Sequence, residues 1–274
     1  MKPISTSEKM MFNTIRITAS NGSCGTGSFF TFNVDNKSIP VIITNQHVIN
    51  YNPDEKVNLF FHLKGDDGDP TDNLSIEFQS SWIFHSQYDL CFCYAAPLFA
   101  IIKERFEKEV FYVNTTEEFI YSKEQLYDLS ALEELVMVGY PIGLWDEKNN
   151  FPIFRKGYTA CHPAIDFNSE NIGVVDMACF PGSSGSPIFI LNENGFTDKK
   201  GNVYLGSQRL VLLGYLFEGP QMSITGEIKV KNIPTSTQKL VADSRIMVNL
   251  GYYIKANVLF DFKNIIKSEL AKNS

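Results

Sequence analysis

Paired cysteines, metal-ligand patterns and long apolar runs are all missing from this sequence. Its 274 residues include five cysteines, an odd number without paired spacing. Cys91 and Cys93 stand two residues apart on a predicted strand, where both side chains point to one face but are poorly oriented to form a disulfide. No CxxC or HxxxH pattern indicates a zinc site. We therefore expect reduced thiols, no bound metal or other cofactor, and a cytoplasmic protein.

A targeting segment, a membrane span and a basic surface are not indicated either. Residues 1–9 lack the apolar run of a secretory signal, and no stretch reaches the apolar length of a membrane span. The 24 Lys and Arg and the 31 Asp and Glu residues give a net charge of −7 and are interspersed. Because no basic block or stripe is present, we expect a protein that binds neither nucleic acids nor membranes.

Short strand-like segments dominate what is present. A hydrophobic fraction of 44% with 20% charged residues is typical of a folded globular protein. Aromatic and β-branched residues fill short segments, and turns rich in Asn, Asp and Gly separate them. Predicted strands occupy residues 12–18, 27–32, 40–44, 57–63, 74–78, 89–94, 134–139, 154–162, 173–178, 186–191, 209–217 and 251–255. Many short strands and few helices predict an all-β fold, and the length suits two six-stranded antiparallel barrels.

Helical patterns are confined to two parts of the chain. Residues 97–135 have helix-like apolar spacing and a capping signal, which predicts a connector with a helical insertion. Residues 257–272 are amphipathic and predict a C-terminal helix packed on the body. We therefore predict a single domain over residues 1–274, with a first barrel in 1–96 and a second in 136–256. Residues 198–206 and 221–243 are expected to form long loops or hairpins.

A serine-rich turn is the most informative motif. Residues 180–187 read Phe-Pro-Gly-Ser-Ser-Gly-Ser-Pro and lead into an apolar strand. On such a tight turn Ser184 can present its hydroxyl at the surface, with main-chain N–H groups beside it. A nucleophile next to such donors is what acyl transfer requires. Alone the motif is weak, because Gly-Ser turns are common in β proteins.

Two earlier segments supply the other groups that such a serine needs. His47 follows an apolar strand within Thr-Asn-Gln-His-Val, and Asp89 opens another strand within Tyr-Asp-Leu. Histidine is the commonest general base for a serine, and a carboxylate fixes its tautomer. His47-Val48-Ile49 is expected to begin a short helical turn. The other histidines are expected to be surface or structural residues: His62, His85 and His162.

The order His47, Asp89, Ser184 and the sequences around these residues resemble the chymotrypsin/trypsin-like serine peptidase superfamily, and in particular its disulfide-free, HtrA-like bacterial branch. The segment Gly-Thr-Gly-Ser-Phe-Phe at 25–30 is similar to the early strand of that family. Val-Gly-Tyr-Pro-Ile-Gly at 138–143 is similar to the strand that opens its second barrel. The resemblance covers roughly residues 12–260 and implies a chymotrypsin-like fold with the active site between two barrels.

The resemblance implies a role for each matching residue. Ser184 would attack the scissile carbonyl, His47 would take and return the proton, and Asp89 would orient His47. The N–H groups of Gly182 and Ser184 would form the oxyanion hole. The partners would be a protein or peptide substrate and an activating or inhibiting protein, as in bacterial stress or defence systems. Residues 97–135 and 221–243 are where such control is expected to act.

Substrate selection would depend on two further segments. The resemblance places Ala178 and Cys179 at the floor of the specificity pocket, and Phe217 and Gly219 in one wall. Because Ala178 offers no carboxylate, we expect an apolar or small side chain before the scissile bond rather than Lys or Arg. Glu218, within the wall segment, is expected to face solvent.

Two departures from the family pattern and two alternative functions complete the prediction. Ser183 stands where secreted members carry an aspartate that binds a freshly cut N-terminus, so activation by trimming is not expected. Ser186 replaces the last glycine of a Gly-x-Ser-x-Gly elbow, which argues against an α/β-hydrolase.

A catalytically silent peptidase-fold module that binds peptides or a partner remains open, as does an esterase-type hydrolase. The complete triad favours a serine endopeptidase.

Overall fold

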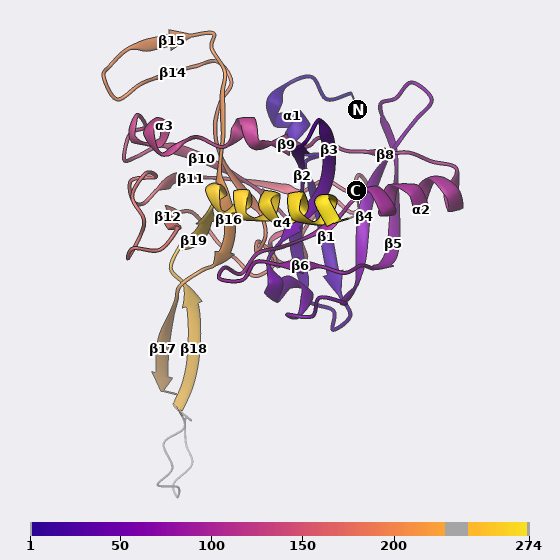
Figure 1. Cartoon of the computed structure of the whole chain (residues 1–274). Helices are drawn as coiled ribbons and strands as arrows, with labels where there is room; N and C mark the ends of the chain where they lie inside the picture. Colours follow the sequence, from indigo (N-terminus) through magenta and orange to yellow (C-terminus); the bar gives the residue numbers. More distant parts are fainter. Residues whose placement is uncertain (1, 228–240, 273–274) are drawn as a thin grey trace, which may run out of the picture.

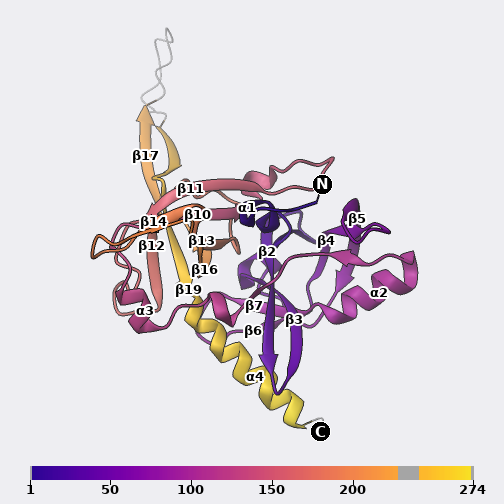
Figure 2. The ribbon, with the colours of Figure 1, turned by 90° about the horizontal axis from the view of Figure 1, so that it is seen from above.

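Two β units and a C-terminal helix make up the protein (Figure 1). The computed structural model describes residues 2–227 and 241–272. An N-terminal sheet, in indigo and purple, lies beside a barrel in pink to orange, and helix α4 (Leu259–Lys272) runs across them (Figures 1 and 2). The predicted predominance of strands and the predicted C-terminal helix are confirmed.

The first unit is a nine-stranded sheet, and the closed first barrel that the sequence predicted is not found in the described residues. The strand order is β5-β4-β1-β2-β3-β7-β6, with β8 paired to β4 and β9 to β2. The strands are β1 (Thr14–Ala19), β2 (Cys24–Val34), β3 (Lys37–Thr44), β4 (Lys56–Lys64), β5 (Pro70–Gln79), β6 (Ile83–Phe84), β7 (Cys91–Tyr94), β8 (Val110–Phe111) and β9 (Thr115–Thr116). The end strand β6 has two residues, and helix α2 (Ala96–Phe106) buries Leu98 and Ile102 in the core of this unit. Helix α2 therefore covers part of the apolar core of this unit.

The second unit is a closed six-stranded barrel, as predicted. Its order is β10-β11-β12-β19-β16-β13. The strands are β10 (Glu134–Gly139), β11 (Ile153–Thr159), β12 (Ile172–Asp176), β13 (Pro187–Asn192), β16 (Arg209–Glu218) and β19 (Leu250–Lys255). Met137 and Ile190 belong to an apolar cluster inside the barrel. Because side chains alternate along a strand, Val136 and Val138 point the other way, into a separate cluster.

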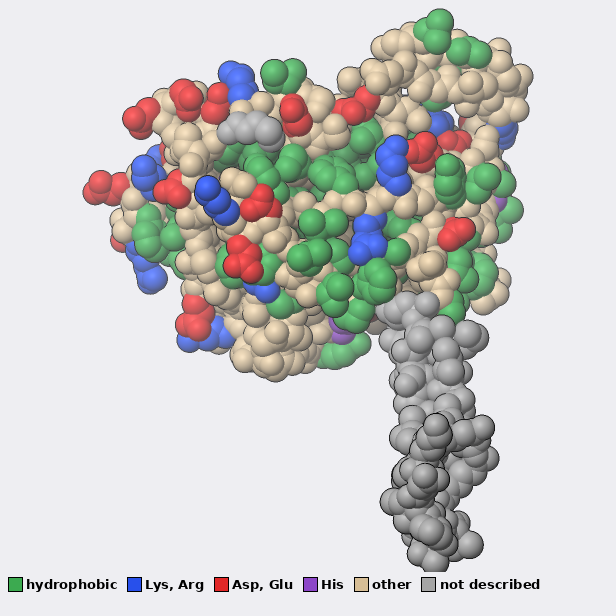
Figure 3. Space-filling view, turned by 180° about the vertical axis from the view of Figure 1, so that it is seen from behind, with side chains coloured by type: hydrophobic (Ala, Val, Ile, Leu, Met, Phe, Trp, Pro, Cys, Tyr) green, Lys and Arg blue, Asp and Glu red, His purple; other side chains and the backbone are tan. Residues whose placement is uncertain are grey.

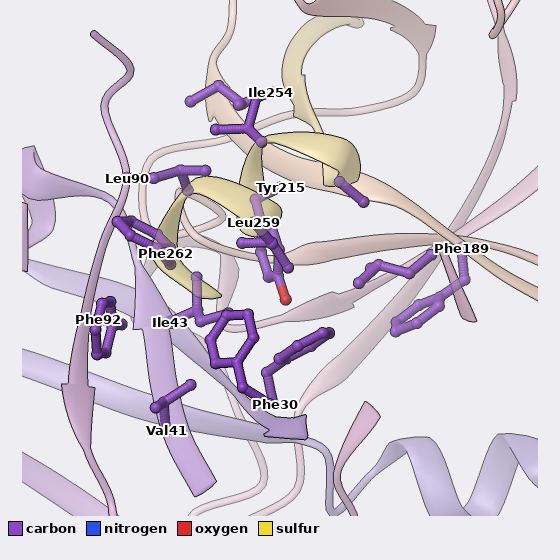
Figure 4. Packing of buried hydrophobic residues seen from close by; sticks show 14 of the residues in the cluster. Phe30, Val41, Ile43, Leu90, Phe92, Phe189, Tyr215, Ile254, Leu259 and Phe262 are labelled. Carbon is purple, nitrogen blue, oxygen red and sulfur yellow. The ribbon is translucent and has the colours of Figure 1, made fainter. Parts of the chain in front are cut away.

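That separate cluster joins the sheet, the barrel and helix α4 (Figure 4). Figure 4 shows Phe30 from the sheet, Phe189 and Tyr215 from the barrel, and Leu259 and Phe262 from the helix converging on one apolar volume. Each of these five side chains is at most 1% exposed. Burial of one large apolar side chain contributes about 1.5–3 kcal/mol, so this cluster holds the two β units in a fixed relation.

The predicted connector and hairpins contain regular elements. Short helix α1 (Thr6–Met10) precedes the sheet, and the segment 97–135 contains most of α2 together with η2 (Glu117–Phe119) and α3 (Lys123–Tyr127). The two segments expected to be loops or hairpins overlap two hairpins that extend beyond them: β14 (Gly195–Thr197)–β15 (Val203–Leu205) and β17 (Gln221–Glu227)–β18 (Val241–Met247). Both hairpins project from the body (Figure 1). Residues 228–240, part of the predicted control segment 221–243, lie outside the described residues.

Surface charge follows the mixed pattern of the sequence. On the face seen in Figure 3, Lys and Arg side chains lie among Asp and Glu side chains rather than in a separate basic area. Among the described residues, no helix has both the length and the apolar character needed to cross a lipid bilayer.

A buried ion pair joins the entrance of β10 to the start of β16. The guanidinium of Arg209 donates to the Glu133 carboxylate at 2.5 Å, and each side chain is only 8% exposed. Arg209 also donates through Nε to Asn192 at 2.8 Å and lies over the Phe196 ring at 4.4 Å. Glu133 in turn accepts from the N–H of Ser130 at 2.9 Å. Both charges are thus compensated by several partners at once.

Replacing Glu133 is expected to destabilise the protein strongly. Glu133→Ala leaves the buried Arg209 charge without a carboxylate and should lower the free energy of unfolding by about 3–5 kcal/mol. The matched control is Glu77→Ala, which breaks the exposed Lys56–Glu77 pair and should change it by less than about 1 kcal/mol. Urea titration followed by tryptophan fluorescence measures both. Equal losses of unfolding free energy in the two variants would contradict the conclusion that the buried Arg209 charge depends on Glu133.

Candidate active site

His47 lies at the point where strand β3 gives way to a single turn of 3₁₀ helix. The turn, η1 (Gln46–Ile49), is the helical turn predicted from the sequence. Val48 and Ile49 are buried and anchor it, while Asn50 and Tyr51 end it with positive φ values of 55° and 53°. The His47 side chain remains 31% exposed. The turn therefore fixes the backbone and leaves the imidazole at the surface.

Asp89 binds His47 through both carboxylate oxygens. One oxygen lies 2.5 Å from Nδ1 of the imidazole, and the other accepts from the main-chain N–H of His47 at 3.1 Å. With Nδ1–H directed at the carboxylate, the other ring nitrogen, Nε2, is the one that can accept a proton. Nε2 has no partner among the described residues, so this nitrogen is available to a neighbouring hydroxyl.

The loop that carries Asp89 is held by the two residues before His47. Asn45 donates its side-chain amide to the main-chain carbonyl of Asp89 at 2.6 Å. The Gln46 amide nitrogen lies within 3.0 Å of three carbonyls of the same loop: those of His85, Tyr88 and Leu90. Three consecutive residues, Asn45, Gln46 and His47, therefore form hydrogen bonds to Asp89 or to the loop that carries it.

His85 supports the same loop from the other side. Its Nδ1 accepts from the main-chain N–H groups of Gln87 and Tyr88, both at 3.1 Å. This leaves Nε2–H to donate to Asp261 of helix α4 at 3.1 Å, and the imidazole is only 4% exposed. His85 is thus a hydrogen-bonded structural residue, as the sequence predicted. The sequence did not indicate that it links the Asp89 loop to the C-terminal helix.

The serine loop consists of two successive turns, each with a glycine at its third position. In the first, the N–H of Ser183 bonds to the carbonyl of Phe180 at 3.0 Å, with Pro181 and Gly182 between them. Gly182 has φ +88°, and proline followed by a positive-φ glycine is the pattern of a type II turn. In the second, the N–H of Ser186 bonds to the carbonyl of Ser183 at 3.0 Å, and Gly185 has φ +81°.

Only one of the three serines in these turns is accessible. Ser183 is 1% exposed and Ser186 is fully buried, whereas Ser184 is partly exposed. The hydroxyls of Ser183 and Ser186 are enclosed without a partner in the described residues. The geometry thus singles out Ser184, the residue chosen from the sequence.

Two main-chain N–H groups near Ser184 are free to bind an anion. The carbonyl of Pro181 accepts from the N–H of Ile142 at 2.5 Å. In a trans peptide the C=O and N–H point in opposite directions, so the N–H of Gly182 faces away from Ile142. Within the described ranges, neither this N–H nor that of Ser184 has an acceptor. Ile142 itself has φ +51°, which is rare for a β-branched residue.

Thr26 of strand β2 brings the serine loop against the segment that carries His47. Its N–H donates to the carbonyl of Ser184 at 2.9 Å, and its hydroxyl donates to that of Gly182 at 3.1 Å. Its own carbonyl accepts from the hydroxyl of Thr44, three residues before His47, at 2.8 Å. A Cβ on Gly185 would collide with this Thr26 carbonyl. The residues of the predicted triad therefore come from three segments that meet where the sheet contacts the barrel.

The residues expected to form the specificity pocket have different surroundings. Ala178 is half-buried, whereas Cys179 is 2% exposed and packs inside the barrel, against Gly251. Phe217 and Gly219 are half-buried on strand β16 and just after it. The register of β16 with β19 slips between Leu216 and Glu218. Phe217 is thus the extra residue of a bulge, with no partner in that ladder.

Tyr51 is a residue at the site that sequence reasoning missed. Its ring centroid lies 6.5 Å from that of His47, and the side chain is 63% exposed. Partial burial raises the pKa of Tyr51, and the negative charges of Asp89 and Glu218 raise it further. Glu218 is exposed, as expected, and is close enough to Tyr51 for its negative charge to raise the pKa of the Tyr51 hydroxyl. The position of Tyr51, four residues after His47, was the only sequence feature that could have indicated its place at the site.

No protein-family model matches the chain, and no curated protein is detectably similar to it in sequence. The part of the chain that the structure describes also contains no group of three His, Cys, Asp or Glu side chains placed to hold a metal ion. The interpretation of the site therefore depends on its geometry.

Placing a methyl group on Gly182 is expected to disable the two free N–H groups. In Gly182→Ala the new carbon would lie 2.5 Å from the carbonyl oxygen of Tyr140, so the turn must shift. Fluorophosphonate modification of Ser184 should slow by at least about a hundredfold. Gly201→Ala is the matched control, because Gly201 also has a positive φ, of 87°, but no neighbour within 4 Å. Similar rates in both variants would contradict the role of the turn.

Removing the imidazole of His85 is expected to loosen the Asp89 loop without unfolding the protein. His85→Leu should slow fluorophosphonate modification of Ser184 by up to about a hundredfold, since small misplacements of reacting groups have effects of that size. The pH dependence of the modification rate should also change, which a purely structural defect would not produce. His162→Leu, at a half-buried histidine outside the site, is the control and should match the wild type in both measurements.

Proposed function

We propose that this protein is a serine endopeptidase that cleaves protein or peptide substrates with His47, Asp89 and Ser184. The observation that carries the proposal is the paired hydrogen bonding of Asp89 to His47. It is joined by Ser184, the one accessible serine of a loop that Thr26 links to the segment before His47 and that has two free N–H groups. This combination supplies a nucleophile, a base of fixed tautomer and an anion-binding site.

The proposed reaction begins when His47 Nε2 takes the proton of the Ser184 hydroxyl as its oxygen attacks the scissile carbonyl carbon. The carbonyl oxygen becomes an oxyanion that accepts from the N–H groups of Gly182 and Ser184. His47 then gives its proton to the leaving amine, which departs and leaves an acyl ester on Ser184. A water molecule, activated by His47 in the same way, releases the acid and restores the serine. Asp89 keeps the imidazole oriented and stabilises its charged form throughout.

Strand β16 offers a place for the substrate backbone. The bulge at Phe217 leaves that residue out of the ladder with β19, and Gly219 follows directly. An extended peptide can pair with such free main-chain groups, with its side chains reaching alternate sides. We propose that residues 217–219 bind the substrate chain on the amino side of the scissile bond, and that Tyr51 and Glu218 contact its side chains there.

The alternatives make different demands on the site. A silent binding module has no use for a serine with free oxyanion donors next to an oriented histidine, so the geometry favours the enzyme. An esterase would use the same groups, and only the substrate separates it from a peptidase. Control by an activating or inhibiting protein, in a cytoplasmic stress or defence setting, is part of the proposal.

Substitution of either reacting residue is expected to abolish both covalent labelling and proteolysis. Ser184→Ala and His47→Ala should lower the rate of fluorophosphonate labelling and of cleavage of a denatured protein by at least about a thousandfold. Ser268→Ala, on an exposed position of α4, and His162→Ala are the controls. Wild-type protein that is not labelled would overturn the triad, whereas labelling without cleavage of any denatured protein would favour the esterase.

A further inference from the structure

Arg155 has an unusual place on strand β11. Burial alternates along this strand, with exposed Phe154, Lys156 and Tyr158 on one face and less exposed residues on the other. Arg155 is on the second face, opposite Met137 of β10, whose side chain lies in the apolar interior of the barrel. A charged side chain therefore points into the mouth of the barrel.

The guanidinium of Arg155 lies over the ring of Phe180, the first residue of the serine loop. Its central carbon is 4.7 Å from the ring centroid of Phe180, two residues before Gly182. Its charge also reaches Cys179: burial raises the pKa of that thiol to about 12, and Arg155 opposes the rise. Both contacts are to residues at the predicted floor of the specificity pocket or next to it.

No described residue accepts a hydrogen bond from this guanidinium. Its Nε atom is enclosed without a partner, and no carboxylate pairs with it. Asp176 is exposed at the end of β12 and forms no ion pair with it. By contrast, Arg209 of the same barrel binds Glu133 and Asn192, and Arg16 donates to Thr18 and Cys24. Arg155 is thus a half-buried cation to which the described residues offer no anion.

An unpaired cation in a partly buried position lowers the stability of a protein unless a ligand of opposite charge binds to it. Arginine has a planar fork of donors that matches a carboxylate in two parallel hydrogen bonds. We propose that Arg155 binds the carboxylate of a Glu or Asp side chain immediately before the scissile bond, so that the enzyme selects acidic residues there. This inference rests on the proposed peptidase function. It replaces the sequence-based expectation of an apolar or small side chain, which followed from the lack of a carboxylate at Ala178.

Diphenyl phosphonate probes that carry the side chain of Glu, Gln, Leu or Arg at this position test the inference on the full-length protein. Such probes modify the serine without turnover, so a missing natural substrate does not matter. The Glu probe should modify wild-type protein at least about fifty times faster than the isosteric Gln probe, because the two differ only in the charge that Arg155 binds. Equal rates for Glu and Gln, or faster reaction of Leu or Arg, would overturn the inference.

Two substitutions connect the preference to Arg155. Arg155→Gln should reduce the Glu-over-Gln ratio to about one, with each rate divided by the rate of the same variant with an uncharged fluorophosphonate. Arg155→Lys should keep part of the ratio. Lys156→Gln, the neighbour on the exposed face of β11, is the matched control and should keep all of it. A Glu preference that persists in Arg155→Gln would also overturn the inference.

The uncharged fluorophosphonate separates the two proposals. Labelling of Ser184 without a Glu preference removes the role of Arg155 and leaves the peptidase standing. Absence of labelling in the wild type removes the reactive serine and the acidic preference together.

Discussion

Thr26 is the residue on which the geometry of the candidate site depends. Its N–H and hydroxyl hold two carbonyls of the serine loop, its hydroxyl also accepts from the N–H of Tyr140 at 3.1 Å, and its carbonyl binds Thr44. The sheet, the end of β10 and the loop that carries Ser184 are thereby tied to one fully buried side chain and its backbone. A buried polar network of this kind fixes a unique arrangement only when every member is satisfied.

Each β unit by itself carries only part of the groups that the proposed reaction needs. The sheet supplies an oriented imidazole–carboxylate pair, and the barrel supplies a serine with two free N–H donors. Pre-organisation of this type lowers a barrier because no group has to be rearranged at the moment of reaction. The same division explains why the three residues are so far apart in the sequence. It also gives the cluster around Phe30, Phe189 and Phe262 a second role under the proposed function, because that cluster joins the unit of His47 to the unit of Ser184.

Local patterns were sufficient for some of these features and not for others. The motifs around His47, Asp89 and Ser184 located residues that the structure brings to one region, and the second barrel and C-terminal helix followed from periodicity. Closure of the first barrel is not found in the described residues, where these strands form a nine-stranded sheet, because a count of strands does not say whether a two-residue strand such as β6 closes a ladder. The position of Arg155 could not be deduced either, since Arg155 and Lys156 are both basic and only the register with Met137 decides which one faces inward. The bond from Ile142 to Pro181 involves main-chain atoms alone, so no side-chain pattern encodes it.

The bond between His85 and Asp261 also has a consequence for the order of events during synthesis. Helix α4 follows both β units along the chain, so a nascent polypeptide can form the sheet and the barrel before Asp261 and Phe262 have left the ribosome. Domains fold as their chain emerges, and until then His85 lacks its bond to Asp261 and the shared cluster lacks the side chains of α4. If Ser184 is reactive as proposed, its full reactivity is therefore expected only after residues 259–272 have been made and α4 has packed onto both β units.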